Sequence, residues 1–222
     1  MLICCHTLTH AGRRDRLERS LRCLAAQTQP YVNHVRDWTE SGGTCGHNRN
    51  RINQDCGAMP SAVTHIAHWD DDDYSHPYRL QHQKLIMETT GADIVGYNEI
   101  PILDETNGEV WIYKHPTSTW VFDTTMMYRR ECWDEIGNEF EDTNTGVETK
   151  WLRKQRNAGR HIVGVSGLIG DIPMVVACMG ADSTNLRRSL EKAKTLDHTF
   201  QGWLPAPSDV ELSARAVVER VG

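Results

Sequence analysis

The sequence contains no long apolar run, no paired cysteine motif and no excess of positive charge. No stretch approaches the roughly 20 apolar residues that span a bilayer, and no basic leader precedes a long apolar segment. We therefore expect neither a transmembrane segment nor a secretory signal. The net charge of −6 gives no general attraction to nucleic acid or to anionic membranes.

The seven cysteines are scattered, and no two of them form a CxxC pair. An odd, unpatterned set is typical of reduced thiols, so the sequence predicts a cytoplasmic protein without structural zinc. With 222 residues and 39% hydrophobic content, the chain can bury one sizeable core. We expect one domain at 1–200, followed by a linker and a terminal helix at 201–222.

Strand and helix patterns alternate along the first half of the chain. The predicted strands are 2–7, 31–35, 62–69 and 92–97, and the predicted helices lie around 17–24, 47–55 and 77–87. This order predicts an α/β fold with a mostly parallel sheet covered on both faces. Ligands of such sheets bind at the carboxyl ends of strands, where Thr7, Asp37 and the run Asp70–Asp73 would lie.

The second half has shorter predicted elements. Strands are expected at 109–114, 124–128, 161–165 and 174–178, and a helix is expected to start at Thr145 or Gly146. Ser208 followed by Glu211 is a capping-box pattern, which predicts a terminal helix through Val221. The stretch 201–207 has the composition of a linker.

Four consecutive carboxylates, Asp70–Asp73, follow the third predicted strand and precede Tyr74–Pro77. Adjacent anions repel one another and Asp is a poor strand former, so the run belongs at a strand end or on a loop. A divalent cation would remove the repulsion, since Mg²⁺ and Mn²⁺ combine one or two protein carboxylates with phosphate oxygens. The alternatives are a solvated loop or a Ca²⁺ site, although the spacing does not match an EF-hand.

Two other groups of side chains have an ordinary explanation beside a functional one. The arginines between 13 and 22 are expected on the exposed face of a helix, with a role near phosphates as the alternative. The aromatic residues of the second half are expected in the core, with acceptor stacking as the alternative. The groups are Arg13, Arg14, Arg16, Arg19 and Arg22, and Trp111, Trp120, Phe122 and Trp133.

Four segments carry a resemblance to a known family by their composition and their order along the chain: Ile3–Thr9, Leu24–Thr28, Asn48–Ile52 and Asp70–Pro77. Together they resemble family 2 glycosyltransferases of the GT-A fold. The resemblance implies a Rossmann-like, mostly parallel sheet with a smaller acceptor-side sheet and a C-terminal helical appendage. Residues 1–98 would form the half that binds a nucleotide sugar, and residues 99–200 the acceptor-side half.

The resemblance implies a metal-dependent, inverting glycosyltransferase that moves a sugar from a nucleotide-diphosphate sugar to a hydroxyl group. A UDP-sugar is the favoured donor, and Mn²⁺ or Mg²⁺ would bind a DxD motif, which alignment on Pro77 places at Asp70 and Asp72. Asp72 would be the most direct metal ligand, and Asp70 would lie nearer the ribose or the metal's waters. Asp71 and Asp73 would support the site or remain solvated, and Asp71 is counted among the donor-binding residues.

Three further residues are implied to bind the donor. Thr7 ends the first strand, and Asp37 matches a position that contacts the nucleobase, although Glu40 competes for it. Arg49 matches the Arg of an ARN-like segment and would reach the uracil or the diphosphate. A surface cation on a helix is an equal alternative for Arg49.

The resemblance also implies a catalytic base, which takes the proton of the acceptor hydroxyl. Glu148 stands at the catalytic position of an ED-like motif, although Val147 replaces the usual Glu and Glu148 the usual Asp. The pair Glu141 and Asp142 is the rival. Near the C-terminus Met179 replaces a metal-binding His; a thioether is a poor ligand for a hard cation, so Asp182 or waters could serve instead.

Two other functions stay open from sequence alone. One is a catalytically silent nucleotide-binding or metal-binding module of the same fold, and the other is a nucleotidyltransferase. The acceptor is expected to be a saccharide by default, with a modified nucleobase as an alternative. The sequence also leaves open whether the chain forms a homo-oligomer. Acceptor specificity lies in variable loops, which the resemblance does not cover.

Overall fold

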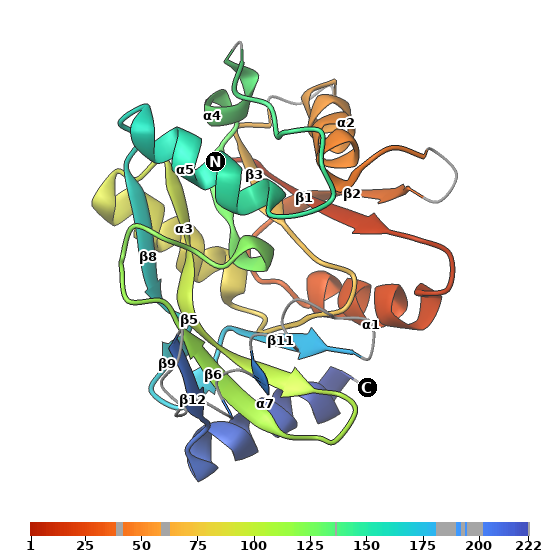
Figure 1. Cartoon of the computed structure of the whole chain (residues 1–222), viewed down its shortest axis with the longest axis vertical. Helices are drawn as coiled ribbons and strands as arrows, with labels where there is room; N and C mark the ends of the chain where they lie inside the picture. Colours follow the sequence, from red (N-terminus) through yellow and green to blue (C-terminus); the bar gives the residue numbers. More distant parts are fainter. Residues whose placement is uncertain are drawn as a thin grey trace.

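The structure is a computed structural model in which helices pack against one large mixed sheet (Figure 1). It describes residues 1–38, 42–58, 63–135, 137–180, 190–191, 194 and 202–221, without the side chains of 217 and 219–221. None of the helices in these ranges is long and apolar enough to cross a bilayer.

The first half folds as the alternation predicts. Strand β1 (Ile3–Thr9) lies between β2 (Tyr31–Asp37) and β3 (His65–His68), and both pairings are parallel. The helices are α1 (Arg14–Ala25), α2 (Cys45–Gly57) and α3 (Arg79–Thr90). Helix α2 packs against β1 and β2, and α3 packs against β5 (Ile94–Asp104). The carboxyl ends of β1, β2 and β3 therefore meet at one edge, as expected for an α/β sheet.

The second half extends the same sheet with strands of both directions. β7 (Met127–Arg129) runs antiparallel between β3 and β5, and β6 (Val110–Lys114) runs antiparallel to the other part of β5. Strands β8 (Ile162–Ser166) and β11 (Val175–Met179) pair with β5 in parallel. The α/β class is confirmed, and the long β5 joins the two halves.

Short elements complete the fold. They are β4 (Tyr74–Ser75), the 3₁₀ helix η1 (Asp123–Thr125), α4 (Glu131–Asp134), α5 (Val147–Asn157), β9 (Leu168–Ile169) and β10 (Ile172–Pro173). β4 pairs with β11, and β9 pairs with β10. The helix expected after Gly146 is therefore α5, while the expected strand at 124–128 is divided between η1 and β7.

The end of the chain is attached to the sheet. Strand β12 (Trp203–Pro205), within the stretch that has a linker's composition, pairs antiparallel with β6, and Trp203 is fully buried. Helix α7 (Ser208–Val221) is the terminal helix that the capping box predicts, and it packs against β4, β10 and β11. The terminal segment is thus anchored by backbone pairing and by apolar packing.

The cysteines differ from the expectation of seven thiols. Cys4 of β1 and Cys56 of α2 form a disulfide, whereas the other five are free thiols. Both paired residues are fully buried beside Val63, where α2 packs against β1. Their separation of 52 residues carries no pairing signal in the sequence, so only the packing of α2 on β1 brings the two sulfur atoms together.

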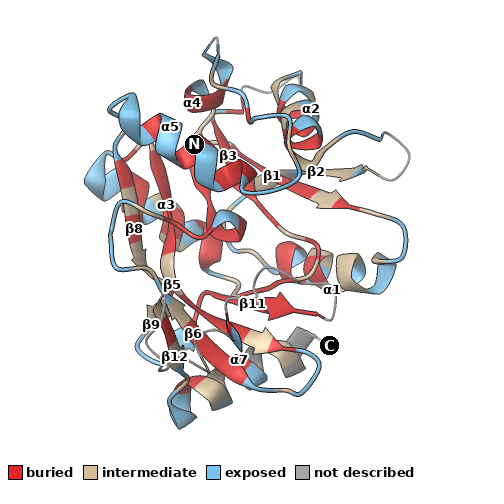
Figure 2. Cartoon of the chain, in the orientation of Figure 1, coloured by how far each residue is buried: buried red, intermediate tan, exposed pale blue. Residues whose placement is uncertain are grey.

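The buried residues lie mainly in the strands of the sheet (Figure 2). The strands are largely buried, and the exposed residues lie mainly on the outer faces of helices and on loops. Of the four aromatic residues considered for acceptor stacking, Trp111, Phe122 and Trp133 are each only 8% exposed and belong to core clusters. Trp120 alone keeps intermediate exposure.

Candidate active site

The acidic run lies at the carboxyl edge of β3, and its members have different surroundings. Asp70, Asp71 and Asp72 line one cavity of about 220 Å³. Asp73 instead points into the protein, where it accepts hydrogen bonds from the hydroxyl of Thr124 and from the amide of Cys178, at 2.9 Å in the latter case. The Asp73 carboxylate therefore fixes the run against η1 and β11, and it is neither solvated nor part of the cavity wall.

Arginines of the first helix lie against the run. Arg13 Nη1 is 2.8 Å from Asp71 Oδ1 and 3.2 Å from Asp72 Oδ2, and Arg16 is 3.9 Å from the same Asp72 oxygen. Arg19 donates to the backbone oxygen of Asp72 at 2.8 Å. The expectation that these three arginines only form an exposed helical face is therefore wrong, because all three contact the acidic run. Their positive charge offsets part of the repulsion between its carboxylates.

The Asp72 carboxyl remains in an acidic environment. Burial, followed by the nearby charge of Asp70 and opposed by Arg13, raises the pKa of Asp72 to about 7. Asp71 Oδ2 is buried and has no hydrogen-bond partner among the described residues. A cluster of carboxylate oxygens that still carries mutual repulsion is a chemically suitable environment for a hard divalent cation.

Metal ligation would rest on few protein atoms. Within the described ranges, no group of three or more His, Cys, Asp or Glu side chains is arranged to hold a metal ion. Mg²⁺ and Mn²⁺ commonly take only one or two carboxylates, with phosphate oxygens and waters as the other ligands. Asp70 and Asp72 on the same cavity wall fit that mode. Met179 is fully buried in a core cluster, and Asp182 and Glu40 lie outside the described residues.

Arg49 of α2 connects the two acidic sides of the site. Its Nη2 donates to Asp70 Oδ1 at 2.9 Å, and its Nε donates to Glu148 Oε1 at 3.1 Å. The Arg49 side chain is only 6% exposed, so the alternative of a surface cation is wrong. Burial acts to lower the pKa of the guanidinium, but the charges of Asp70 and Glu148 outweigh it and hold that pKa well above its usual value.

The start of α2 explains the position of Arg49. Thr44 caps the helix by accepting from the His47 amide at 3.1 Å, so α2 begins two residues earlier than the sequence pattern predicts. A Cβ atom at Gly46 would lie 1.8 Å from the Glu141 backbone oxygen, so only glycine allows the helix to approach the 141–143 loop so closely. Asn50 then accepts from the Phe140 amide at 2.9 Å. These contacts dock α2 against the segment that leads into α5.

Glu148 lies in the first turn of α5 and is 7% exposed. The rival pair is on the surface: exposed Glu141 is paired with Lys150 at 2.9 Å, and exposed Asp142 accepts from the hydroxyl of Thr44. Of the candidate bases in the sequence, Glu148 is thus the one that the fold brings to Arg49 and Asp70.

Asp123 is an acidic residue of this site that the sequence pattern does not indicate. Asp123 is an exposed residue overall, although neighbouring protein atoms partly desolvate its carboxyl. This desolvation, followed by the charges of Glu148 and Asp70, raises the pKa of Asp123 to about 7. A lone Asp after an aromatic stretch belongs to no motif, so its proximity to Glu148 emerges only from the path of η1.

The wall of the cavity includes only some of the residues expected from the sequence. Its remaining lining residues are Leu8, His10, Arg13, Trp38, Cys45 and Arg49. Thr7 is fully buried and does not line the cavity, and Asp37 is exposed outside it. Successive strand residues point in opposite directions, so a shift of one residue from Asp37 to Trp38 changes the side chain that reaches the cavity. Trp38 brings an indole ring to this wall, 6.1 Å from the His10 ring.

Comparison with solved structures identifies the fold. No protein-family model matches the chain, and no relative was found among curated proteins. A crystal structure of a Staphylococcus aureus TarS fragment aligns with a TM-score of 0.60 and 16% identity, over 80% of this chain and 60% of that one. A crystal structure of the fragment with UDP aligns with a TM-score of 0.60 and 13% identity, over 100% of this chain and 70% of that one.

A second kind of neighbour is more distant. A Drosophila β-1,4-galactosyltransferase 7 variant, in complex with manganese, UDP-Gal and xylobiose, aligns with a TM-score of 0.53 and 13% identity. That alignment covers 76% of this chain and 67% of the galactosyltransferase chain. The architecture of the chain is thus that of the GT-A glycosyltransferases. In the TarS comparison above, the chain spans about 60% of the matched fragment.

Proposed function

We propose that the chain is a metal-dependent, inverting glycosyltransferase that uses a nucleotide-diphosphate sugar, with a UDP-sugar as the favoured donor. One observation carries the proposal: a single buried guanidinium, that of Arg49, joins Asp70 of the donor side to Glu148 of the acceptor side, at 2.9 and 3.1 Å. The GT-A architecture and the neighbours crystallised with UDP, UDP-GlcNAc and UDP-Gal support the choice of donor.

The proposed donor site is the cavity at the carboxyl edge of β1 and β3. Trp38 and His10 supply ring surfaces for a nucleobase, and Arg13 supplies positive charge for the diphosphate. Asp70 and Asp72 would hold Mn²⁺ or Mg²⁺. When bound, the cation would offset the negative charge that develops on the leaving diphosphate.

Glu148 is the proposed general base. The acceptor oxygen forms the new bond to the anomeric carbon, while the bond from that carbon to the diphosphate oxygen breaks and its electron pair leaves with the nucleoside diphosphate. The proton of the acceptor hydroxyl passes to Glu148. Arg49 acts as a positioning residue, because its bond to Oε1 fixes the orientation of the Glu148 carboxylate.

The two proposed halves of the chain contribute different parts of the site. Residues 1–98 contribute the donor wall, and residues 99–200 contribute Glu148 and Asp123. The acceptor is proposed to approach from the α5 side, and a saccharide is its default class.

The test is an incubation of the purified chain with UDP-sugars and Mn²⁺, with products separated by chromatography. Release of UDP that depends on Mn²⁺ and is lost in Glu148→Gln supports the proposal. Release of pyrophosphate would instead indicate a nucleotidyltransferase. The control variant Glu141→Gln removes a nearby exposed carboxylate and should release UDP at the wild-type rate.

A catalytically silent module is the second candidate, and one observation favours it. Glu148 is held by the buried Arg49 in an ion pair at 3.1 Å, so one of its carboxylate oxygens is already engaged within the protein. Binding of UDP without release from any UDP-sugar, in both the wild type and Glu148→Gln, would support the module.

A further inference from the structure

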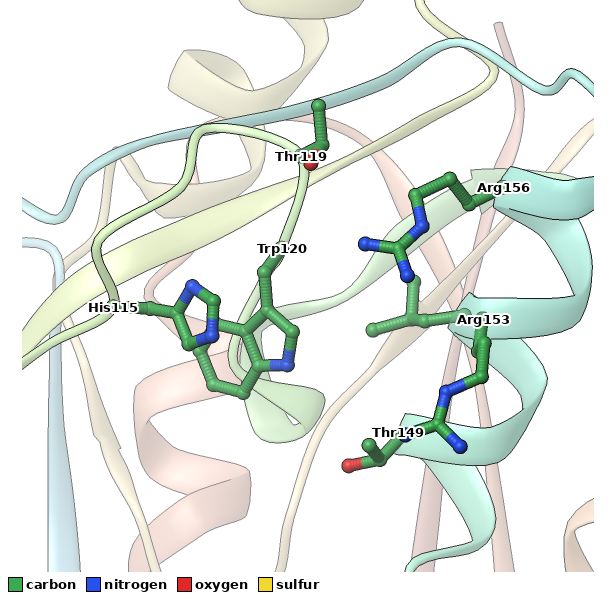
Figure 3. A pocket seen from close by; sticks show the side chains of 7 residues that line it. His115, Thr119, Trp120, Thr149, Arg153 and Arg156 are labelled. Carbon is green, nitrogen blue, oxygen red and sulfur yellow. The ribbon is translucent and has the colours of Figure 1, made fainter. Parts of the chain in front are cut away.

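A second cavity, also of about 220 Å³, lies beside α5 (Figure 3). One wall carries Arg153 and Arg156, and the opposite wall carries His115 and Trp120. The remaining lining residues are Thr119, Thr149 and Leu152. The cavity shares no lining residue with the proposed donor site.

The charge of this cavity is opposite to that of the whole chain. Its lining includes two guanidinium groups and no carboxylate, although the net charge of the chain is −6. Neither Arg153 nor Arg156 forms a salt bridge within the described part of the protein, whereas Lys150 and Arg160 near the two ends of the same helix are paired with Glu141 and Glu135. Like charges three residues apart on a helix repel, and an anion between them would remove that repulsion.

The facing wall is aromatic. The rings of His115 and Trp120 are stacked, with centroids 4.5 Å apart and an interplanar angle of 17°. The His115 ring accepts from the Thr117 amide at 3.3 Å, which holds it in place. An arginine fork opposite such a wall can bind an anionic group while the wall covers the adjoining apolar part of the same ligand.

The cavity is connected to the proposed catalytic base through one helix. Thr149 follows Glu148 directly, and Thr149, Leu152, Arg153 and Arg156 occupy one face of α5. At a rise of about 1.5 Å per residue, the two arginines lie about 8 and 12 Å along the axis from Glu148. An acceptor whose hydroxyl group is at Glu148 could therefore place a charged group between the arginines.

We propose that this cavity is an acceptor subsite for an anionic group, and that the acceptor is a saccharide bearing a phosphate or a comparable anion. The assignment of the bound molecule as an acceptor rests on the proposed transferase function, but the anion site itself does not depend on that function. Phosphate is the best match, because guanidinium groups bind its oxygens in a fork geometry.

Glucose 6-phosphate, glucose and inorganic phosphate serve as probes, with affinities measured by calorimetry at low salt. We expect glucose 6-phosphate to bind, glucose to bind at least tenfold more weakly, and phosphate to compete with glucose 6-phosphate. Arg153→Ala and Arg156→Ala, measured separately, should each weaken glucose 6-phosphate at least tenfold. Lys154→Ala is the matched control, because Lys154 is an exposed cation of the same helix that does not line the cavity.

The affinity for UDP is measured in every variant and should not change. Equal affinities for glucose and glucose 6-phosphate, or an equal loss of binding in Lys154→Ala, would overturn the proposal. If the wild type fails to bind UDP but retains arginine-dependent binding of glucose 6-phosphate, the proposed function fails and the anion site stands.

Discussion

Replacement of Arg49 by methionine tests how the candidate site is held together. Methionine keeps most of the buried aliphatic volume and removes both charged hydrogen bonds, to Asp70 and to Glu148. The variant leaves two carboxylates facing each other without the cation between them. We expect a large loss of folding stability, because a group buried with its partner removed cannot recover its hydration.

The magnitude follows from the exposure of the three side chains. Breaking a buried ion pair by removing one partner costs about 3–5 kcal/mol. The side chains alone of Arg49 and Glu148 are 6% and 10% exposed, but the Asp70 side chain keeps 29% exposure and can be partly hydrated. The lower end of the range is therefore appropriate, and we predict a loss of about 3 kcal/mol in the free energy of unfolding.

Urea denaturation at pH 7.5 measures this loss, with Arg51→Met as the control. Arg51 is an exposed cation on the same helix, and its replacement should change stability by less than about 0.5 kcal/mol. Adding Glu148→Gln to Arg49→Met removes one of the stranded charges, so the double variant should be about 1–2 kcal/mol more stable than the sum of the single losses. If Arg49→Met is as stable as Arg51→Met, or if the losses are strictly additive, Arg49 does not hold the two carboxylates together as an ion pair.

Three further predictions concern catalysis, metal and pH. Glu148→Gln should lower the rate of UDP release about 10²–10⁴-fold while the affinity for UDP is retained, as measured by chromatography and calorimetry; an unchanged rate would remove Glu148 from the chemistry. Asp72→Asn should abolish the extra thermal stabilisation that Mn²⁺ adds to UDP binding, and an undiminished Mn²⁺ effect would place the metal elsewhere. Burial, followed by the charge of Arg129, lowers the pKa of His65 from 6.5 to about 4, so the folded state binds fewer protons than the unfolded state. The stability due to the neutral form of His65 is therefore fully present above pH 6.5 and falls as the pH drops toward 4. At pH 5 the free energy of unfolding should be lower by about 2 kcal/mol. His65→Gln should flatten the dependence of unfolding free energy on pH between 5 and 7.5, and an identical pH profile would contradict this origin.

The periodic elements of the fold could be predicted from the sequence. The runs that became β1, β2 and β3 are short and alternate with helical runs, and the acidic run directly follows the third of them, so the carboxyl edge of the sheet was identifiable. The weaker predictions were at boundaries. Helix α2 starts at Cys45 because Thr44 caps it and Gly46 allows close packing on the 141–143 loop, and this tertiary contact leaves no periodic signal.

The candidate site was predictable only in part. Asp70, Asp72, Arg49 and Glu148 are brought together, but the bridging role of Arg49 depends on the docking of α2 against the segment before α5. Other members of the site depend on long-range packing. Asp123 joins the site through the path of η1, and Trp38 replaces Asp37 at the cavity because of the direction of one strand residue.

The proposed metal and diphosphate site is tested most directly by a crystal grown with Mn²⁺ and UDP and measured at the manganese absorption edge. We predict an anomalous peak at about 2.1 Å from a carboxylate oxygen of Asp72 or Asp70, with the UDP diphosphate completing the coordination. A manganese peak and a diphosphate bound away from these carboxylates, with Asp70–Asp72 still paired only to arginines, would contradict it.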